Sequence, residues 1–306
     1  MKMIQIEQIT KDYGNDRGVF DVSFDIEEGE VFGFLGPNGA GKTTTIRQIL
    51  GFIRPDKGKV LVEGKKVTRK YYETNADIGY LPGEISFPDG MKGTEFIRWC
   101  AELRGMHDLG RADQLIDLLD LKNADSDVKR MSKGMKQKIG IVCAFMHDPD
   151  ILILDEPTSG LDPLMQEAFI ELIRDEKKRG KTVLMSSHMF PEIEKTCDRT
   201  AIIRSGRIAT VVDMADIQKS SHKEYKIKFK TPADCCSFAK EDFVFSEVNH
   251  EKTRVKVKID DDEINRLIQV LAGYDVHYIS EVKQTLEDYF MHFYESKNMP
   301  KWDRAE

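Results

Sequence analysis

The sequence predicts an α/β protein, in which a mainly parallel sheet with its helices forms the core and a smaller α+β domain follows. From residue 31 to residue 185, strand-like apolar segments alternate with helical patterns, and such alternation implies a mainly parallel sheet. The four apolar residues 151–154 have no polar break between them, which is typical of a strand buried on both faces of such a sheet. Near Asp216 the pattern changes to strands in which apolar residues alternate with lysines, so a second domain is expected there.

The length and charge of the chain narrow the class of protein. A chain of 306 residues favours two domains, because a single core stops growing at about 250–300 residues. The net charge of −7 argues against a dedicated nucleic-acid binder. No apolar run approaches the roughly 20 residues that span a bilayer, and the N-terminus has no apolar signal region. We therefore expect a cytoplasmic protein that reaches a membrane only through a partner.

The cysteines indicate reduced thiols. No two of them form a Cys-x-x-Cys pair, and none stands beside a histidine at a metal-ligand spacing. Two of the five are adjacent, which is a poor geometry for a disulfide. We therefore predict no disulfide and no cysteine metal site among Cys100, Cys143, Cys197, Cys235 and Cys236.

The first domain, residues 1–217, is expected to alternate strands and helices around a helical insertion. Strands are predicted over residues 3–9, 19–26, 31–35, 60–62, 78–81, 151–154 and 182–185. Helices are predicted over residues 42–50, 133–146 and 164–178, and helical periodicity also runs from residue 94 to residue 121.

The second domain, residues 218–306, has the order β-α-β-β-α-β. Its strands are predicted over residues 225–229, 243–248, 255–259 and 276–282, and its helices over residues 233–240 and 264–271. This order fits a small ferredoxin-like domain, and a last helix is expected over residues 286–296.

Residues 36–43 read Gly-Pro-Asn-Gly-Ala-Gly-Lys-Thr and match the pattern G-x-x-x-x-G-K-[ST], the phosphate loop. The loop follows a strand and precedes a helix, which is the context that the pattern requires. Glycines let several backbone N–H groups point at one anion, and the helix N-terminus adds partial positive charge. Lys42 is expected to reach the β- and γ-phosphates, and the Thr43 hydroxyl to ligate Mg²⁺. The predicted nucleotide-binding residues are Gly36, Pro37, Asn38, Gly39, Ala40, Gly41, Lys42, Thr43 and Thr44.

Asp155 and Glu156 stand where open α/β sheets place their ligands, at the carboxyl end of the predicted strand. Taken alone, the pair is equally compatible with a core strand that ends in a solvated acidic turn. The phosphate loop favours a functional reading, because a nucleotide–Mg²⁺ site needs a second metal holder, which Asp155 can supply. Glu156 is then the predicted general base that deprotonates the attacking water.

Through these two segments the chain resembles the ATP-binding cassette (ABC) ATPases, in particular the nucleotide-binding subunit of a bacterial one-cassette exporter. The resemblance covers about residues 2–215, with Walker A at the phosphate loop and Walker B at residues 151–155. Residues 131–137, Met-Ser-Lys-Gly-Met-Lys-Gln, are similar to the family's Leu-Ser-Gly-Gly-Gln signature segment, and residues 159–162 to its D-loop. His188 stands at the position of the switch histidine, and Tyr13 resembles the aromatic residue that stacks on adenine.

The resemblance implies a fold and an assembly. The family's P-loop NTPase core carries an antiparallel β subdomain and a helical subdomain, here about residues 84–135, which grips a separate membrane permease. Two subunits, expected to be identical, meet head to tail, so that Ser132 and Gly134 of one contact the ATP held by the other. The implied cofactors are ATP and Mg²⁺, the expected location is the inner face of the cell membrane, and no nucleic acid is expected as a partner.

Two residues depart from the family pattern. Lys133 replaces a glycine of the signature segment, where it either adds charge at the phosphate or points to solvent. The glutamine expected after residues 80–82 is missing, and Gly83 and Glu84 stand there instead. Glu84 is therefore a candidate, by position only, for the missing Mg²⁺ contact.

Two questions stay open at this level. The first is whether the chain drives solute export or is a soluble ABC ATPase that acts on ribosomes or DNA; one cassette, no heptad run and an acidic balance favour export. The second is whether residues 222–295 form a regulatory module, a dimerisation surface or a packing appendage. The transported solute is not readable from this chain, because its chemistry lies in the permease.

Overall fold

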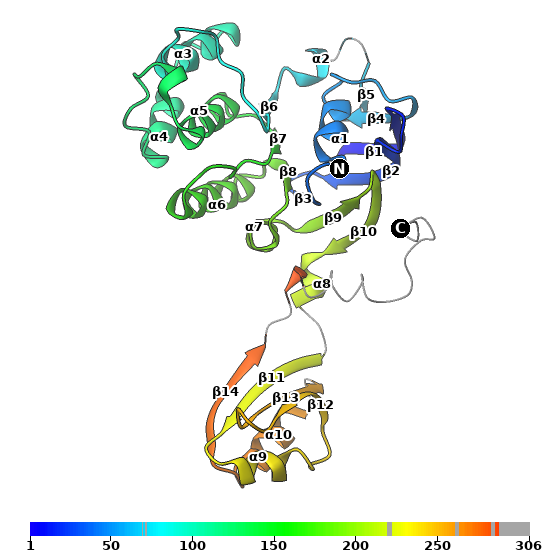
Figure 1. The fold of residues 1–306 in the computed structure, drawn as a ribbon. Helices are drawn as coiled ribbons and strands as arrows, with labels where there is room; N and C mark the ends of the chain where they lie inside the picture. Colours follow the sequence, from blue (N-terminus) through cyan, green and yellow to red (C-terminus); the bar gives the residue numbers. More distant parts are fainter. Residues whose placement is uncertain (69, 71, 219–221, 261–262, 283–284, 288–306) are drawn as a thin grey trace. The chain divides into compact units, whose positions relative to one another are not determined.

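The computed structural model describes residues 1–68, 70, 72–218, 222–260, 263–282 and 285–287 (Figure 1). It divides into two units, Met1–Met214 and Ala215–Glu306. No helix among the described residues is both long enough and apolar enough to span a bilayer. The functional division into an ATPase domain over residues 1–217 and an accessory domain over residues 218–306 stays a prediction.

A six-stranded sheet with the order β10-β9-β3-β8-β7-β6 forms the centre of the first unit. The pairs that join β9, β3, β8, β7 and β6 are parallel, and β10 pairs with β9 in the antiparallel sense. Every residue of β3, β7 and β8 is buried, which explains the unbroken apolar run over residues 151–154 of β7. The strands are β3 (Val31–Leu35), β6 (Ile78–Leu81), β7 (Ile151–Asp155), β8 (Thr182–Ser187), β9 (Arg199–Arg204) and β10 (Arg207–Asp213).

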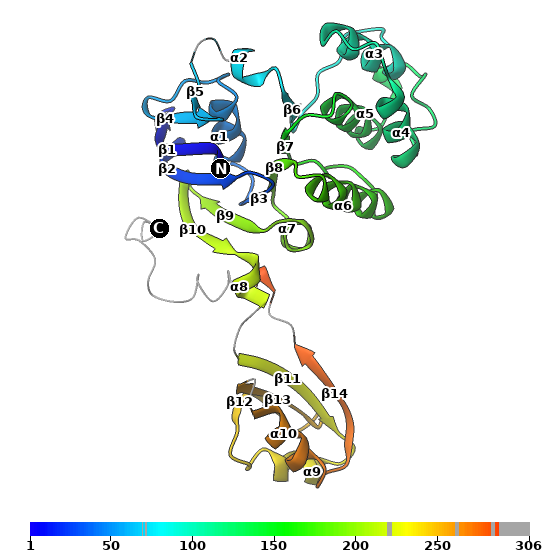
Figure 2. The ribbon, with the colours of Figure 1, turned by 180° about the vertical axis from the view of Figure 1, so that it is seen from behind.

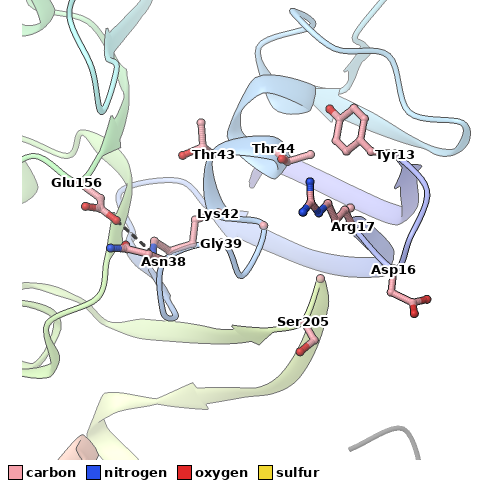
Figure 3. Close-up of a pocket in the computed structure, with 13 residues that line it drawn as sticks. Tyr13, Asp16, Arg17, Asn38, Gly39, Lys42, Thr43, Thr44, Glu156 and Ser205 are labelled. Carbon is pink, nitrogen blue, oxygen red and sulfur yellow. Dashed lines mark ion pairs between the residues drawn. The ribbon is translucent and has the colours of Figure 1, made fainter. Parts of the chain in front are cut away.

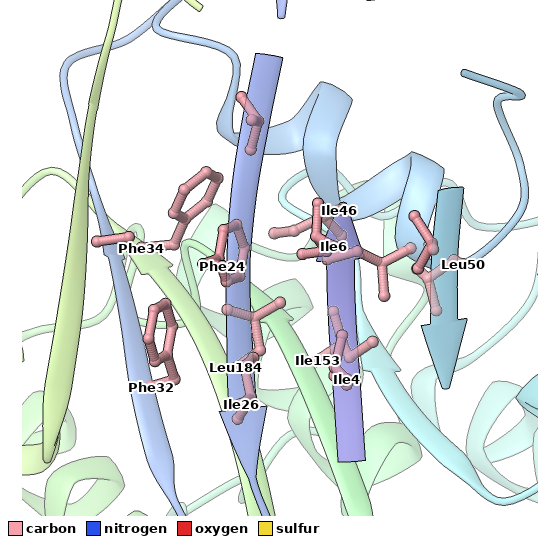
Figure 4. Close-up of a cluster of buried hydrophobic side chains, with 14 of the residues drawn as sticks. Ile4, Ile6, Phe24, Ile26, Phe32, Phe34, Ile46, Leu50, Ile153 and Leu184 are labelled. Atoms are coloured by element: carbon pink, nitrogen blue, oxygen red, sulfur yellow. The ribbon is translucent and has the colours of Figure 1, made fainter. Parts of the chain in front are cut away.

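A second, antiparallel sheet packs on the helix that follows the phosphate loop. Its order is β2-β1-β4-β5, with β1 (Lys2–Asp12), β2 (Gly18–Glu27), β4 (Lys57–Val62) and β5 (Lys65–Lys66). Figure 4 shows the apolar core between this sheet, the central sheet and α1 (Lys42–Ile49). There the rings of Phe24 and Phe32 stack with their centroids 5.1 Å apart, and Ile46 is fully buried. This packing fixes the first turn of α1, which carries Lys42 and Thr43.

The helices α3, α4 and α5 gather in one group apart from the antiparallel sheet (Figures 1 and 2). The helical periodicity over residues 94–121 corresponds to two helices, α3 and α4. The chain leaves the first of them at residues 104–109, where Gly105 has a φ of +67°. The helices of this unit are α2 (Tyr72–Asn75), α3 (Gly93–Leu103), α4 (Gly110–Leu118), η1 (Val128–Arg130), α5 (Lys133–Phe145), α6 (Pro163–Lys178) and α7 (Phe190–Thr196). A further helix, α8 (Met214–Gln218), begins at the last residue of the unit.

The second unit has the predicted order β-α-β-β-α-β, and its sheet order β12-β13-β11-β14 is antiparallel throughout. Most of the helix expected over residues 286–296 falls on residues 288–296, which lie outside the described part of the chain. All five cysteines are described, and no disulfide joins any two of them. The elements are β11 (His222–Phe229), α9 (Pro232–Phe238), β12 (Val244–Asn249), β13 (Arg254–Asp260), α10 (Ile264–Leu271) and β14 (Val276–Val282).

Phe238 is the residue on which the core of the second unit centres. Its ring is fully buried and lies 5.2 Å from the ring of Phe229 and 5.5 Å from that of Tyr274, between centroids. Phe238→Ala should therefore lower the free energy of unfolding of this unit by about 3–5 kcal/mol, measured by urea titration. The matched control is Ile268→Ala, because Ile268 is 57% exposed and its loss should change stability by less than about 0.5 kcal/mol. Equal effects of the two substitutions would contradict this core.

Candidate functional site

The phosphate loop joins β3 to α1 and wraps around the amine of Lys42 (Figure 3). The Lys42 side chain is 5% exposed, and its Nζ donates to the carbonyl oxygens of Gly36 at 2.7 Å and Pro37 at 3.2 Å. Gly41 has a φ of +109°, which only glycine adopts without strain. A Cβ at Gly36 would lie 2.3 Å from the Ile203 carbonyl oxygen, so no larger residue fits there.

A pocket of about 430 Å³ opens in front of this loop. Tyr13, which is half exposed, stands on one side of it, and the Glu156 carboxylate stands on the other (Figure 3). Of the predicted nucleotide-binding residues, Gly36, Pro37 and Ala40 shape the loop without lining the pocket. The lining residues are Tyr13, Asp16, Arg17, Gly18, Asn38, Gly39, Gly41, Lys42, Thr43, Thr44, Glu156, Ser205 and Gly206. The pocket therefore holds the backbone donors and the cation that a phosphate chain requires.

Asp155 ties the end of β7 to α1 and to β8. Its carboxylate is 1% exposed and accepts hydrogen bonds from Thr43 Oγ1 at 2.7 Å and from Ser186 Oγ at 2.5 Å. Sequence reasoning paired Thr43 with Asp155 through a shared metal, and the structure brings these two side chains into contact. It missed Ser186, because nothing in the run Val-Leu-Met-Ser-Ser shows which serine points at β7.

Glu156 lies between Lys42 and His188. One carboxylate oxygen is 3.2 Å from Lys42 Nζ, and the other is 3.4 Å from His188 Nδ1. The backbone of Glu156 has a φ of +50°, a strained value for a residue with a side chain. Four hydrogen bonds hold this backbone: its N–H donates to Ser186 O and Oγ, and its carbonyl accepts from Gln137 Nε2 at 3.2 Å and from the Ser159 N–H at 3.1 Å. The strained turn aims the carboxylate into the pocket.

Glu192 supports the loop that carries His188, although the sequence analysis did not select it. Ser187 Oγ donates to its Oε2 at 2.5 Å and accepts from the Met189 N–H at 2.9 Å. Glu192 is 6% exposed, and this burial raises the pKa of its carboxyl, although hydrogen bonds from Ser187 and Thr158 lower it. The only sequence signal was an acid in the first turn of the helix after His188.

Three predicted residues lie elsewhere in the same subunit. Ser132 caps α5, and its Oγ accepts from the Met135 N–H at 3.2 Å. Neither Ser132 nor Gly134 lines the pocket. Glu84 is exposed, and among the described residues it makes no hydrogen bond or ion pair. Gly83 is instead the neighbour of the Asp155 carboxylate, because a Cβ built on it would lie 3.3 Å from Asp155 Oδ2.

Comparison with known proteins finds relatives that match nearly the whole length of this chain. The profile of the ABC transporter family matches residues 19–159. An uncharacterized ABC transporter ATP-binding protein of Bacillus subtilis, YhcH, is 35% identical over 301 residues, which cover 94% of this chain and 95% of that protein. The bacitracin transport ATP-binding protein BcrA of Bacillus licheniformis is 31% identical over 295 residues, 94% of this chain and 96% of that protein.

Solved structures show the same fold. An ATP-binding subunit of an ABC transporter superimposes with a TM-score of 0.65 at 30% identity, over 71% of this chain and 92% of that chain. A dimeric bacterial ABC transporter cassette superimposes with a TM-score of 0.63 at 22% identity, over 69% of this chain and 99% of that one; this second likeness concerns the fold alone. The predicted fold class is thereby confirmed.

The buried carboxyl of Glu192 predicts a pH dependence of stability. Its pKa is higher in the folded chain than in the unfolded chain, so its protonated form stabilises the fold at low pH, and this contribution is lost as pH rises through the folded pKa. Glu192→Gln keeps a neutral group at every pH. Relative to the natural chain, the variant should gain free energy of unfolding as pH rises from 5 to 8, measured by urea titration. Glu102→Gln, at an exposed glutamate, should change less with pH. A difference for Glu192→Gln that stays constant across this range would refute the assignment.

Proposed function

The chain belongs to the family of ABC transporter ATP-binding proteins, and from this premise we propose that it drives export of a solute through a separate membrane permease. It is an ATPase with the fold of that family. The observation that carries the catalytic part of the proposal is the position of Glu156, between Lys42 and His188 at the mouth of the phosphate pocket.

In this proposal Glu156 is the general base for the attacking water, and His188 holds that water and the carboxylate in register. In the structure, the Lys42 amine forms an ion pair with Glu156 and donates hydrogen bonds to two carbonyl oxygens of the loop. An incoming phosphate would compete for the same amine and would free the carboxylate to accept a proton. General-base help of this kind is typically worth about 10²–10⁴ in rate.

The residues around Asp155 fit Mg²⁺. A hydroxyl and a carboxylate, Thr43 Oγ1 and Asp155 Oδ2, stand 2.7 Å apart, and hard oxygen donors of this kind are the ligands that Mg²⁺ prefers. When bound, the ion neutralises charge on the phosphates. Glu84 is not brought to this pair, so we assign the ion to Thr43 and Asp155 alone.

The pocket of one subunit lacks the signature segment, which supports a site completed by a second subunit. Ser132 and Gly134 stand at the N-terminus of α5, where backbone N–H groups favour an anion, yet they do not line their own pocket. We therefore propose a head-to-tail homodimer in which these residues contact the γ-phosphate held by the partner.

Export through a permease is supported by a relative named for bacitracin transport, whose match covers 94% of this chain and so includes the second unit. The subunit would then lie on the inner face of the cell membrane through its permease. Residues 218–306 would be an accessory domain, for regulation, dimerisation or packing. The alternative, an ATPase acting on ribosomes or DNA, has no such support.

The role of Glu156 predicts a separation of binding from turnover. Glu156→Gln should lower kcat for ATP by about 10²–10⁴ and leave ATP affinity in place, measured by phosphate release and by nucleotide titration. Lys42→Ala should instead lose ATP binding, because the amine that faces the phosphates is gone. Near-normal hydrolysis by the Glu156→Gln variant would overturn the assignment.

The transport role predicts where the protein is found in the cell. The chain should co-sediment with membranes and be released only when detergent dissolves the permease. Recovery with ribosomes in a detergent-free extract, together with absence from membranes, would reject this role.

A further inference from the structure

The side chain of Lys133 contacts the D-loop of its own subunit. Its Nζ donates to Ser159 Oγ at 2.7 Å, so the first helical residue of α5 is bonded to the first residue of the D-loop. Its stem also packs on the same loop, because a Cβ built on Gly160 would lie 3.0 Å from Lys133 Cγ and 3.1 Å from Cδ. Lys133 is exposed, in line with one of the two roles considered in the sequence analysis, but neither role includes these contacts.

Two further contacts join the same segments. The Gly134 backbone lies so close to the D-loop that a Cβ there would be 2.5 Å from the Gly160 carbonyl oxygen. One turn further along α5, Gln137 Nε2 donates to the carbonyl oxygens of Glu156 at 3.2 Å and Pro157 at 2.9 Å. The helix that begins with the signature segment is thus attached along its first two turns to the chain that runs from the catalytic base to the D-loop.

The position of Lys133 is electrostatically unfavourable by itself. A cation in the first turn of a helix faces the positive end of the helix dipole, where an acidic residue is normally favoured. The Ser159 hydroxyl accepts a hydrogen bond from the Lys133 amine and so gives this cation a partner. A glycine at residue 133 would have neither this hydrogen bond nor the packing on Gly160.

We propose that Lys133 is a positioning residue that latches the signature segment to the D-loop, so that the two move as one body. The latch is a property of the single subunit. Its consequence rests on the proposed function: ATP contacted by Ser132 belongs to one site of the dimer, whereas Glu156 of the same chain belongs to the other. The latch therefore couples the contact of Ser132 with ATP at one site to the position of Glu156 at the other site.

The kinetic test is a double-mutant cycle on ATP hydrolysis. Lys133→Met and Ser159→Ala should each lower kcat by about 3- to 10-fold, the loss of one hydrogen bond, and should lower the Hill coefficient for ATP while KM stays within about twofold. The double variant should match the single variants, because both remove the same contact. Lys133→Arg, which keeps a donor, should restore most of the rate, and Lys138→Met is the matched control on the same helix. Additive losses, or a rise in KM confined to Lys133→Met, would overturn the latch in favour of a direct phosphate contact.

A second measurement tests the latch without catalysis. In the nucleotide-free chain, amide hydrogen exchange over residues 157–162 should be faster in Lys133→Met and in Ser159→Ala than in the natural chain and in Lys138→Met. Unchanged exchange in both variants would refute the latch even if the chain hydrolyses ATP normally. If the natural chain hydrolyses no ATP but the two variants still show the faster exchange, the proposed function is refuted and the latch is kept.

Discussion

The buried carboxylate of Asp155 is the contact on which the rest of the site depends. It accepts from Thr43 on α1 and from Ser186 on β8, and so it fixes the phosphate loop to two neighbouring strands of the central sheet. A carboxylate at 1% exposure is stable only when it is hydrogen-bonded, because burying an unpaired charge is very costly. The hydrogen bond from Thr43 also keeps the Thr43 hydroxyl at the place where a metal would bind.

The catalytic geometry follows from this anchor. Glu156 is the next residue, and its strained backbone is held by Ser186, the serine that also bonds Asp155. The carboxylate then meets Lys42 on one side and His188 on the other, with His188 held by the loop that Glu192 supports. Strain of this kind persists only where the surrounding hydrogen bonds over-determine it, which is common at functional sites. In the proposed dimer, a second subunit would add the donors of the signature segment to this pocket.

The sequence was sufficient for features that are encoded locally. It predicted the phosphate loop between a strand and a helix, the carboxylate pair at the end of a buried strand, and the period-two strands of the second unit. It was insufficient where contacts join distant segments: Ser186 and Gln137 meet the Walker B turn from other elements. The strands β9 and β10 had no counterpart among the predicted elements. Lys133 shows the same limit, because its partner lies 26 residues away and no pattern connects them.

The central claim is that each ATP site is built from two subunits, and subunit complementation tests it most directly. In a Glu156→Gln background, Lys42→Ala disables one half of each site, and Ser132→Arg disables the other half. Each variant alone should stay monomeric with ATP, whereas their mixture should form dimers that hold one ATP each, measured by solution mass and bound nucleotide. A mixture that stays monomeric, or a Ser132→Arg variant that dimerises with ATP by itself, would contradict the account.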